Sequence, residues 1–217
     1  MCAVGDEDQS IYGFRGADFT NILNFEKKWP ETKIITLERN YRSTQKILDA
    51  ANAVISKNTL RRPKNLYSRA NKGANLTIFE AENEKEEADF IARKIKNFLQ
   101  KEALSSPIAI LCRANFQFPA LEEAFLNRSI PYQTASKQNS LLNQDSQPVR
   151  LMTVHASKGL EFKYVFVPGV EKGLFPYINS DNGEERRLFY VALTRAEKKI
   201  FLSYSRYRNL LCDSPVF

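Results

Sequence analysis

Short apolar runs alternate with segments of helical periodicity along most of the chain, and this alternation limits what the chain can fold into. Most of the runs are apolar on both faces, as the strands of a parallel sheet covered by helices must be. Strands separated by helices in this order predict an open α/β sheet. We expect strands at Lys33–Leu37, Leu76–Phe79, Ile108–Cys112, Val149–Val154, Tyr164–Val167 and Ile200–Tyr204.

The segments between these runs place apolar residues on one face of a helix. Ser43 can cap a helix whose apolar stripe runs from Ile47 to Ile55, and a longer stripe of the same kind follows Asn83. Further helices are expected at Asp18–Trp29, Phe118–Asn127 and Glu184–Ala196.

Composition limits the classes of partner and of site. The chain has 32 Lys and Arg against 25 Asp and Glu, a formal net charge of +7, and Lys57–Lys72 holds six of these bases and no acid. This balance makes an anionic partner plausible. Cys2, Cys112 and Cys212 are odd in number and far apart, which predicts neither a disulfide framework nor a thiolate metal site and is typical of a reducing cytoplasm. No apolar run approaches the ~20 residues of a membrane span, so we expect a cytoplasmic protein without a membrane partner.

The order of the segments predicts more than one domain. Met1–Val4 looks like the end of a buried strand, where a domain seldom begins. We therefore expect residues 1–30 to be the tail of a preceding domain and residues 31–217 to form a second one. Within the second domain, Ser136–Gln147 holds eight Ser, Gln or Asn residues in twelve, which predicts a surface connection between two blocks of the sheet.

Four clusters are candidates for chemistry: GDEDQSIYGFRGA at residues 5–17, LERNYRS at 37–43, LMTVHASKGLEF at 151–162 and EERRLFYVALTRAE at 184–197. In the last cluster, Arg195 lies seven residues after Leu188 and so continues the buried face of its helix. An unpaired buried charge is very costly, so this guanidinium either finds an anion or complements the carboxyl end of the helix.

Aromatic and basic residues adjoin in two other clusters. Tyr41 and Arg42 fall between an expected strand end and a helix cap, where open sheets gather ligands. They offer a ring for a base and a guanidinium for a phosphate, or else they form a turn around a packed tyrosine. Phe14 and Arg15, beside Tyr12, offer a charged stacking surface that suits single-stranded nucleic acid, or an ordinary aromatic anchor under a loop. His155, at the end of an apolar strand, is by itself more typical of a hydrogen-bonded core histidine than of a catalytic base.

In order and spacing, the four clusters resemble helicase motifs III, IV, V and VI of the superfamily 1A DNA helicases, the UvrD/PcrA/Rep group. The resemblance spans almost the whole chain. It implies a RecA-like 2A domain, an open parallel sheet flanked by helices, preceded by the tail of a 1A domain. In that family ATP binds between 1A and 2A while single-stranded DNA crosses both. The full enzyme is therefore expected to be a 3′→5′ DNA helicase that uses ATP and Mg²⁺.

The resemblance also assigns residues by type. Positioned positive charge does most of the catalysis in phosphoryl transfer, and an arginine finger is worth ~10³–10⁵ in rate in comparable NTPases. The resemblance implies three catalytic residues, Gln9, Arg42 and Arg195. It implies nucleotide contacts from Gln9, Tyr41, Arg42, Lys158, Glu161 and Arg195. It implies DNA contacts from Tyr12, Phe14, Arg15, Arg113, Asn115, Thr153 and His155, and no metal ligand.

Parts of the family pattern are missing. No two of the eight glycines have the spacing of G-x-x-x-x-G-K-[ST], so there is no P-loop. Asp6-Glu7-Asp8-Gln9 mimics the acidic Mg²⁺ motif, but the SIYGFRGA behind it identifies motif III. The family's large 2B insertion is replaced by Ser136–Gln147. We therefore expect the chain to bind neither ATP nor Mg²⁺ by itself, and to hydrolyse ATP negligibly without a 1A domain in cis or in trans. The alternative is a stand-alone module that binds single-stranded DNA or a protein and hydrolyses nothing.

Overall fold

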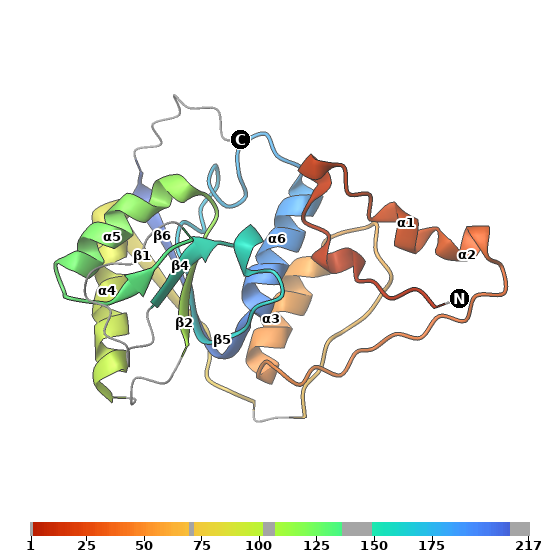
Figure 1. Ribbon diagram of the computed structural model, residues 1–217, viewed down its shortest axis with the longest axis horizontal. Coiled ribbons are helices and arrows are strands. Elements are labelled where there is room, and N and C mark those ends of the chain that lie inside the picture. The colour runs from red at the N-terminus through yellow and green to blue at the C-terminus, as the bar shows by residue number, and fades with distance from the viewer. Residues whose placement is uncertain (1, 70–71, 102–106, 136–148, 209–217) are drawn as a thin grey trace.

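The computed structural model describes residues 2–69, 72–101, 107–135 and 149–208, and its centre is one six-stranded sheet (Figure 1). The strands are all parallel and lie in the order β1-β6-β5-β2-β4-β3. The predicted open parallel α/β sheet is therefore confirmed. The strands are β1 Thr77–Asn83, β2 Ile108–Cys112, β3 Tyr132–Gln133, β4 Val149–Thr153, β5 Phe162–Val167 and β6 Ala196–Tyr207.

Two pairs of helices cover the two faces of the sheet (Figure 1). Helices α3 and α6 pack over one face and α4 and α5 over the other, so the protein has a hydrophobic core on each side. In β2, Leu111 belongs to the first core and Ile110 to the second, which explains why this strand is apolar throughout. These helices are α3 Gln45–Ile55, α4 Glu84–Lys101, α5 Phe118–Leu126 and α6 Asn182–Thr194.

The predicted strand Lys33–Leu37 is wrong. This segment runs without a ladder partner, and Ile35 and Leu37 are 72% and 80% exposed. The predicted strand end at the N-terminus is wrong as well, because residues 2–4 are not in a strand and Val4 is 90% exposed. A strand needs a neighbour for its backbone hydrogen bonds, and no edge of the described sheet extends to either segment.

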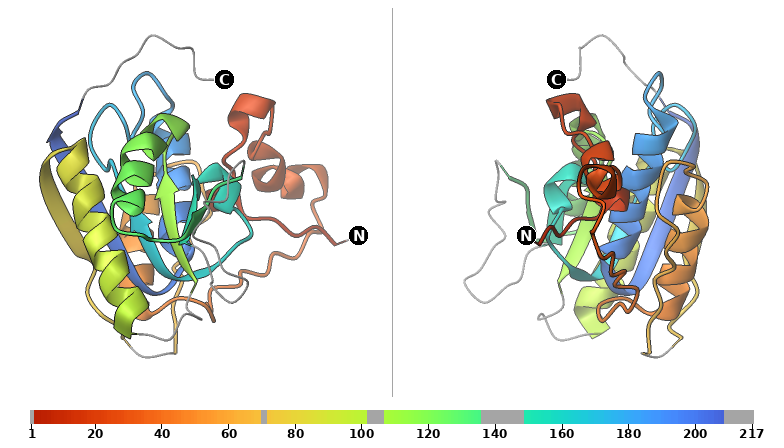
Figure 2. Two further views of the ribbon diagram at one scale, coloured as in Figure 1. Left: turned by 60° about the vertical axis from the view of Figure 1, so that its left-hand side comes forward. Right: turned by 90° about the vertical axis from the view of Figure 1, so that its right-hand side faces the viewer.

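The predicted helix Asp18–Trp29 is replaced by two single-turn helices, α1 Thr20–Leu23 and α2 Phe25–Lys28, without a buried residue. A short helix is marginal unless it packs an apolar face, and neither of these two buries a residue. Residues 2–30 lie on the side of α6, and Ile11 of this segment is fully buried in the first core (Figure 2). The described residues also form four short 3-10 helices, at Glu7–Gln9, Gly13–Arg15, Asn115–Gln117 and His155–Ser157.

Two helix starts differ from the prediction. Thr44, not Ser43, occupies the N-cap of α3, and the Ser43 hydroxyl donates to the Ala196 carbonyl oxygen over 2.6 Å. Ser43 therefore joins the start of α3 to the start of β6. Helix α6 begins after Asp181, whose carboxylate accepts from the backbone N–H groups of Gly183 and Glu184 over 3.0 Å each.

The predicted connection Ser136–Gln147 lies outside the described residues. In the part of the chain that the structure describes, no helix has the length and apolar character of a membrane span. Strand β3, which pairs with β4, was not predicted, because two residues carry no periodic pattern.

Candidate functional site

The first cluster of the sequence lies against the third, although the contacting residues are 143 and 149 positions apart. The Tyr12 hydroxyl donates to the His155 carbonyl oxygen over 3.2 Å, and Lys158 Nζ donates to the Gln9 carbonyl oxygen over 2.9 Å. The tertiary structure therefore brings residues 9–12 of the first cluster beside residues 155–158 of the third.

The fourth cluster holds the same segment from the α6 side. Arg187 Nε donates to the Ser10 carbonyl oxygen, and the Gly13 N–H donates to Glu184 Oε1, each over 2.9 Å. A Cβ at Gly13 would lie 2.4 Å from Glu184 Oε2, so glycine permits this close approach. Gly16 ends the 3-10 helix Gly13–Arg15 with a φ of 80°, a left-handed conformation that glycine adopts without strain. Sequence reasoning did not identify Arg187 or Glu184, although both lie in the fourth cluster.

One connection divides the candidate residues into two groups. Strands β4 and β5 are both parallel to β2, so residues 154–161 run from the carboxyl end of β4 to the amino end of β5. His155 lies at the first end of this connection and Glu161 at the second. The expected DNA contacts therefore gather at one edge of the sheet, and the expected nucleotide contacts gather at the other.

The nucleotide candidates form a network at the amino ends of β5 and β6. Arg42 Nε donates to Glu161 Oε2 over 2.6 Å, and its Nη1 donates to the Thr194 carbonyl oxygen over 3.4 Å. Arg195 Nη2 donates to Thr194 Oγ1 over 3.3 Å and to Gln9 Oε1 over 3.4 Å. Together with the lysine bond to the Gln9 carbonyl, these contacts bring together all but one of the nucleotide candidates.

The exception is Tyr41, which is 81% exposed. The Arg39 guanidinium lies 4.6 Å from the centre of its ring. A turn around a packed tyrosine is therefore wrong for this position, because most of the ring is open to solvent and its one described ring contact is with Arg39. The expected placement of Arg42 at a strand's carboxyl end is also wrong. Because Lys33–Leu37 forms no strand, Arg42 lies instead beside Thr194 at the amino end of β6.

Arg195 is buried, with 3% of its surface exposed, and its partners are neutral oxygens. Its Nε and Nη1 donate to the carbonyl oxygens of Val191 and Leu160 over 3.2 and 3.1 Å. In the described residues no carboxylate lies within ion-pair distance of it. Burial, and then repulsion from the Arg42 guanidinium, lowers the pKa of Arg195 to about 10. Arg195 therefore bonds the carboxyl end of α6, as one alternative expected, and the anion that the other alternative expected is not found among the described residues.

The aromatic DNA candidates form a cluster at the opposite edge. The ring centre of Phe14 lies 5.4 Å from that of His155, edge to face, and 6.0 Å from that of Tyr12. The Arg15 guanidinium lies 5.4 Å from the Phe14 ring centre. Phe14 is 66% exposed, so it is not an anchor packed under the loop. The cluster presents an aromatic face to solvent with a positive charge beside it.

His155 is neutral at ordinary pH. Burial lowers the pKa of this imidazole to about 4, and the nearby Arg113 guanidinium adds to the effect. The side chain therefore offers stacking and hydrogen bonding to a ligand, and no positive charge. His155 is half-buried and contacts the rings of Phe14 and Tyr12, so it is not the core histidine that the strand pattern favoured.

Arg113 follows β2 and is fixed by an acidic partner that sequence reasoning missed. Its Nη2 donates to Glu185 Oε1 over 2.7 Å, and the same carboxylate accepts from the Tyr177 N–H over 3.0 Å. The Arg113 guanidinium also lies 5.1 Å from the Tyr177 ring centre. Glu185 lies inside the fourth cluster, but no spacing in the sequence indicates its pairing with Arg113, 72 positions away. Of the remaining DNA candidates, Asn115 is exposed at the start of its 3-10 helix, and Thr153 Oγ1 accepts from the Ala156 N–H over 3.3 Å.

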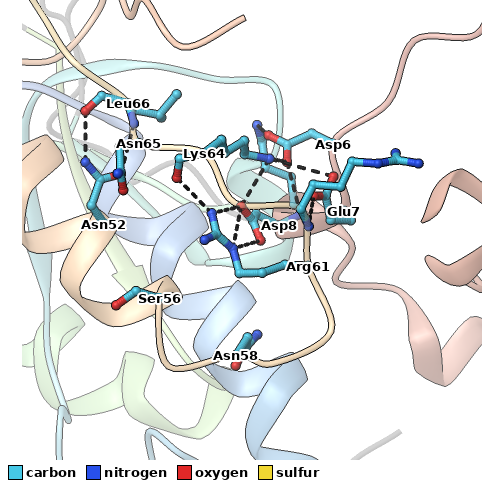
Figure 3. Close-up of polar contacts among 12 residues, drawn as sticks. Asp6, Glu7, Asp8, Asn52, Ser56, Asn58, Arg61, Lys64, Asn65 and Leu66 are labelled. Atoms are coloured by element: carbon cyan, nitrogen blue, oxygen red, sulfur yellow. Dashed lines mark hydrogen bonds and ion pairs between the residues drawn. The ribbon is translucent and has the colours of Figure 1, made fainter. Parts of the chain in front are cut away.

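The acidic run that mimics a Mg²⁺ motif is paired with basic side chains. Asp6 and Asp8 bond Lys64 and Arg61, which come from the loop after α3 (Figure 3). Among the residues that the structure describes, no group of three or more His, Cys, Asp or Glu side chains is arranged to hold a metal ion. These two basic residues were noticed in the sequence only as part of a charge run.

Comparison with known proteins places this geometry in a family. Residues 35–145 and 134–207 match the UvrD-like helicase C-terminal domain, and residues 1–30 match the UvrD/REP helicase N-terminal domain. The ATP-dependent DNA helicases PcrA of Staphylococcus epidermidis and Staphylococcus aureus are 48% identical to the chain over 132 residues. This region is 61% of the chain and 18% of the length of each relative.

A solved structure has the same fold. The C-terminal domain of a possible DNA helicase from Lactobacillus plantarum aligns with a TM-score of 0.54 and 22% identity, covering 76% of this chain and 88% of that one. The motifs, the parallel sheet and the matched residue ranges agree, and the chain belongs to the UvrD-like helicase C-terminal domain family.

Proposed function

We propose that this chain is the C-terminal motor half of an ATP-dependent 3′→5′ DNA helicase, in which Arg42 and Arg195 contact the terminal phosphate of ATP. The observation that carries the proposal is electrostatic. Two guanidinium groups, both bonded to Thr194, lie close enough for one to lower the pKa of the other, and Arg195 has no carboxylate partner among the described residues. A phosphate oxygen between them would supply the missing charge.

The surrounding residues suit the rest of a nucleotide. Gln9, bonded to Arg195, would sense the terminal phosphate. Lys158 and Glu161 would reach the nucleotide from the connection before β5, with Glu161 near the ribose. Tyr41 would stack on the base, because its ring is exposed. The P-loop and the Mg²⁺ ligands would come from the N-terminal half of the motor, and these residues would orient and stabilise the transferred phosphoryl group.

The division of the chain follows from this assignment. Residues 1–30 would be the tail of the 1A domain and residues 31–217 the 2A domain. Placing both arginines on 2A would allow hydrolysis only when the cleft between 1A and 2A closes, and closure would move one DNA-binding surface against the other. The DNA surface would consist of Tyr12, Phe14, Arg15, Arg113, Asn115, Thr153 and His155. Such a motor would work in the cytoplasm.

The test is DNA-stimulated ATP hydrolysis by the chain joined to the N-terminal half of the Staphylococcus epidermidis relative. We expect hydrolysis only when both parts and single-stranded DNA are present. Arg42→Gln and Arg195→Gln should each lower kcat by about a thousandfold or more, the scale of an arginine finger. Arg69→Gln is the matched control, because Arg69 is exposed and the substitution removes the same charge. Hydrolysis by the chain alone, or full activity in either arginine variant, would contradict the proposal.

A second candidate is a module that binds single-stranded DNA and hydrolyses nothing. The exposed Phe14 favours it, because the aromatic cluster is already assembled within this chain. The same experiment separates the two candidates. Binding of DNA without hydrolysis, in the presence of the N-terminal half, would favour the module.

A further inference from the structure

The acidic run Asp6–Asp8 enters a basic loop that follows α3 (Figure 3). Arg61 Nη2 donates to Asp8 Oδ2 over 2.8 Å, and Lys64 Nζ bonds that same oxygen over 3.1 Å. Lys64 Nζ also donates to Asp6 Oδ1. Asp8 is 1% exposed and the Lys64 side chain 11%, so these charges meet away from bulk water. A buried pair of this kind holds its geometry more firmly than a surface ion pair.

The loop that presents these bases is itself fastened to the body of the domain. Asn52 of α3 bonds both the N–H and the carbonyl of Leu66, over 3.1 and 2.8 Å (Figure 3). Arg61 Nη2 donates to the Lys64 carbonyl oxygen over 3.1 Å. Burial alone would lower the pKa of Lys64, but its contacts with Asp6 and Asp8 raise it above the usual value. The ammonium group is therefore charged and fixed in place at neutral pH.

Asp6 connects this loop to the nucleotide network. One carboxylate oxygen, Oδ1, accepts from Lys64 Nζ and from the Asp8 N–H, the latter over 3.0 Å. The other oxygen, Oδ2, accepts from Gln9 Nε2 over 2.6 Å. The Gln9 carboxamide oxygen in turn accepts from Arg195. A continuous chain of polar contacts thus runs from Lys64 through Asp6 and Gln9 to Arg195.

This series of polar contacts determines which way the Gln9 carboxamide faces. A carboxylate can only accept hydrogen bonds and a guanidinium can only donate them. Between Asp6 and Arg195, one orientation satisfies both neighbours: the NH₂ group toward Asp6 and the oxygen toward Arg195. The reversed orientation would place an acceptor against an acceptor and a donor against a donor, and it would lose two charge-assisted bonds.

We propose that Asp6 and Lys64 are positioning residues, which hold the Gln9 carboxamide with its oxygen toward Arg195. Lys64 belongs to the C-terminal body and Asp6 to the segment matched by the N-terminal family model. Gln9 lies in the same segment as Asp6, so it reaches Arg195 only while that segment lies against the C-terminal body. The consequence for catalysis rests on the proposed function. If Gln9 senses the terminal phosphate, its orientation depends on contact between residues 1–30 and the C-terminal body.

The geometry is tested on the 217-residue chain itself by ¹⁵N NMR of the Gln9 side-chain NH₂ group, assigned by its loss in Gln9→Ala. We expect Asp6→Asn and Lys64→Gln to shift this signal and to raise its exchange with water about tenfold, since each removes part of a charge-assisted bond. Lys64→Arg should restore the wild-type signal, because arginine can still donate to Asp6. Lys57→Gln removes the same charge from an exposed position of the loop and should leave the signal unchanged.

An unmoved Gln9 signal in Asp6→Asn would overturn the proposal, as would an equal shift in Lys57→Gln or no restoration by Lys64→Arg. Unfolding midpoints of the variants show whether a shift reflects a general loss of stability. In that case Lys64→Gln and Lys57→Gln would lower the midpoint by similar amounts. In the joined enzyme, Asp6→Asn should lower kcat for ATP with little change in KM. If the wild-type joined enzyme is inactive, the proposed function fails, whereas the NMR result still decides the positioning role.

Discussion

At the scale of single residues, the site combines groups whose charges are set by burial and by neighbours. His155 is the only histidine of the chain, and burial beside Arg113 lowers its pKa from 6.5 to about 4. Arg195 carries the opposite problem, since it is a buried cation close to a second guanidinium. His155 is therefore neutral at pH 7, whereas Arg195 stays charged, because arginine does not lose its proton near neutral pH.

The lowered pKa of His155 predicts a loss of stability in acid. Between pH 6.5 and about 4 the unfolded chain binds a proton that the folded chain excludes, so the free energy of unfolding falls as the pH falls through this window. Between pH 7 and pH 5 the loss from this group should be at most about 2 kcal/mol, and less because part of the ring is exposed to solvent. Urea unfolding at pH 7 and pH 5 measures it, and the His155 ring proton in NMR reports the pKa directly.

His155→Asn is the control for this prediction. It removes the only imidazole, so the part of the pH dependence that falls between pH 6.5 and 4 should shrink. A His155 ring that titrates near pH 6.5 in the folded protein would contradict the prediction.

The candidate nucleotide residues follow from the resemblance of the motifs to those of a known family, which can be recognised because the order and spacing of motifs are properties of the sequence. Their mutual contacts were not predictable to the same degree. The partners of Arg113 and Asp6 come from helix α6 and from the loop after α3. Neither pairing has a signal in spacing, since it depends on where two distant backbones meet. The functional roles of these residues stay predictions.

At the scale of elements, the start of α6 depends on one side chain. Asp181 accepts from two backbone N–H groups that would otherwise lack partners. We expect Asp181→Ala to lower the free energy of unfolding by about 1 kcal/mol, and Asp181→Asn to change it by only a few tenths. Urea denaturation of the two variants measures the difference. Equal stabilities of the alanine and asparagine variants would show that the cap contributes nothing.

The segment Lys33–Leu37 looks like a strand in sequence and is exposed in the structure. Ile35→Ala should therefore change the free energy of unfolding by less than about 0.5 kcal/mol. Ile47→Ala is the matched comparison, because Ile47 is fully buried on the inner face of α3, and its loss should cost about 2–5 kcal/mol. Chemical denaturation of both variants gives the two values. A large effect at Ile35 would mean that this segment packs against the body of the protein in solution.

At the scale of the whole molecule, one sheet separates two chemically different edges. Guanidinium groups converge at the amino ends of β5 and β6, and aromatic rings gather beyond the carboxyl ends of β2 and β4. The connection of residues 154–161 joins the two edges, and the segment Gly5–Gly16 runs beside it. A shift of the backbone at one edge can therefore reach the other edge through the eight residues of this connection.

This arrangement predicts weak, salt-dependent binding of single-stranded DNA by the chain. Phe14→Ala should reduce the affinity for labelled oligothymidine by about tenfold, since stacking on one base is worth ~1–3 kcal/mol. Phe14→Trp should retain binding, and raising the salt concentration should weaken it in every variant. Fluorescence anisotropy at two salt concentrations measures these effects. Binding that is unaffected by Phe14→Ala would place the DNA elsewhere.

By itself, the sequence determined the class of fold, the main helices and most strands, because apolar periodicity records which faces of each element are buried. It also determined the family, through motifs that are local in the chain. The tertiary structure decided which apolar runs become strands, since a strand exists only where a neighbour completes its hydrogen bonds. It also decided how charged groups are matched across the fold, as in the chain of contacts from Lys64 to Arg195, because electrostatic partners are set by distance in space.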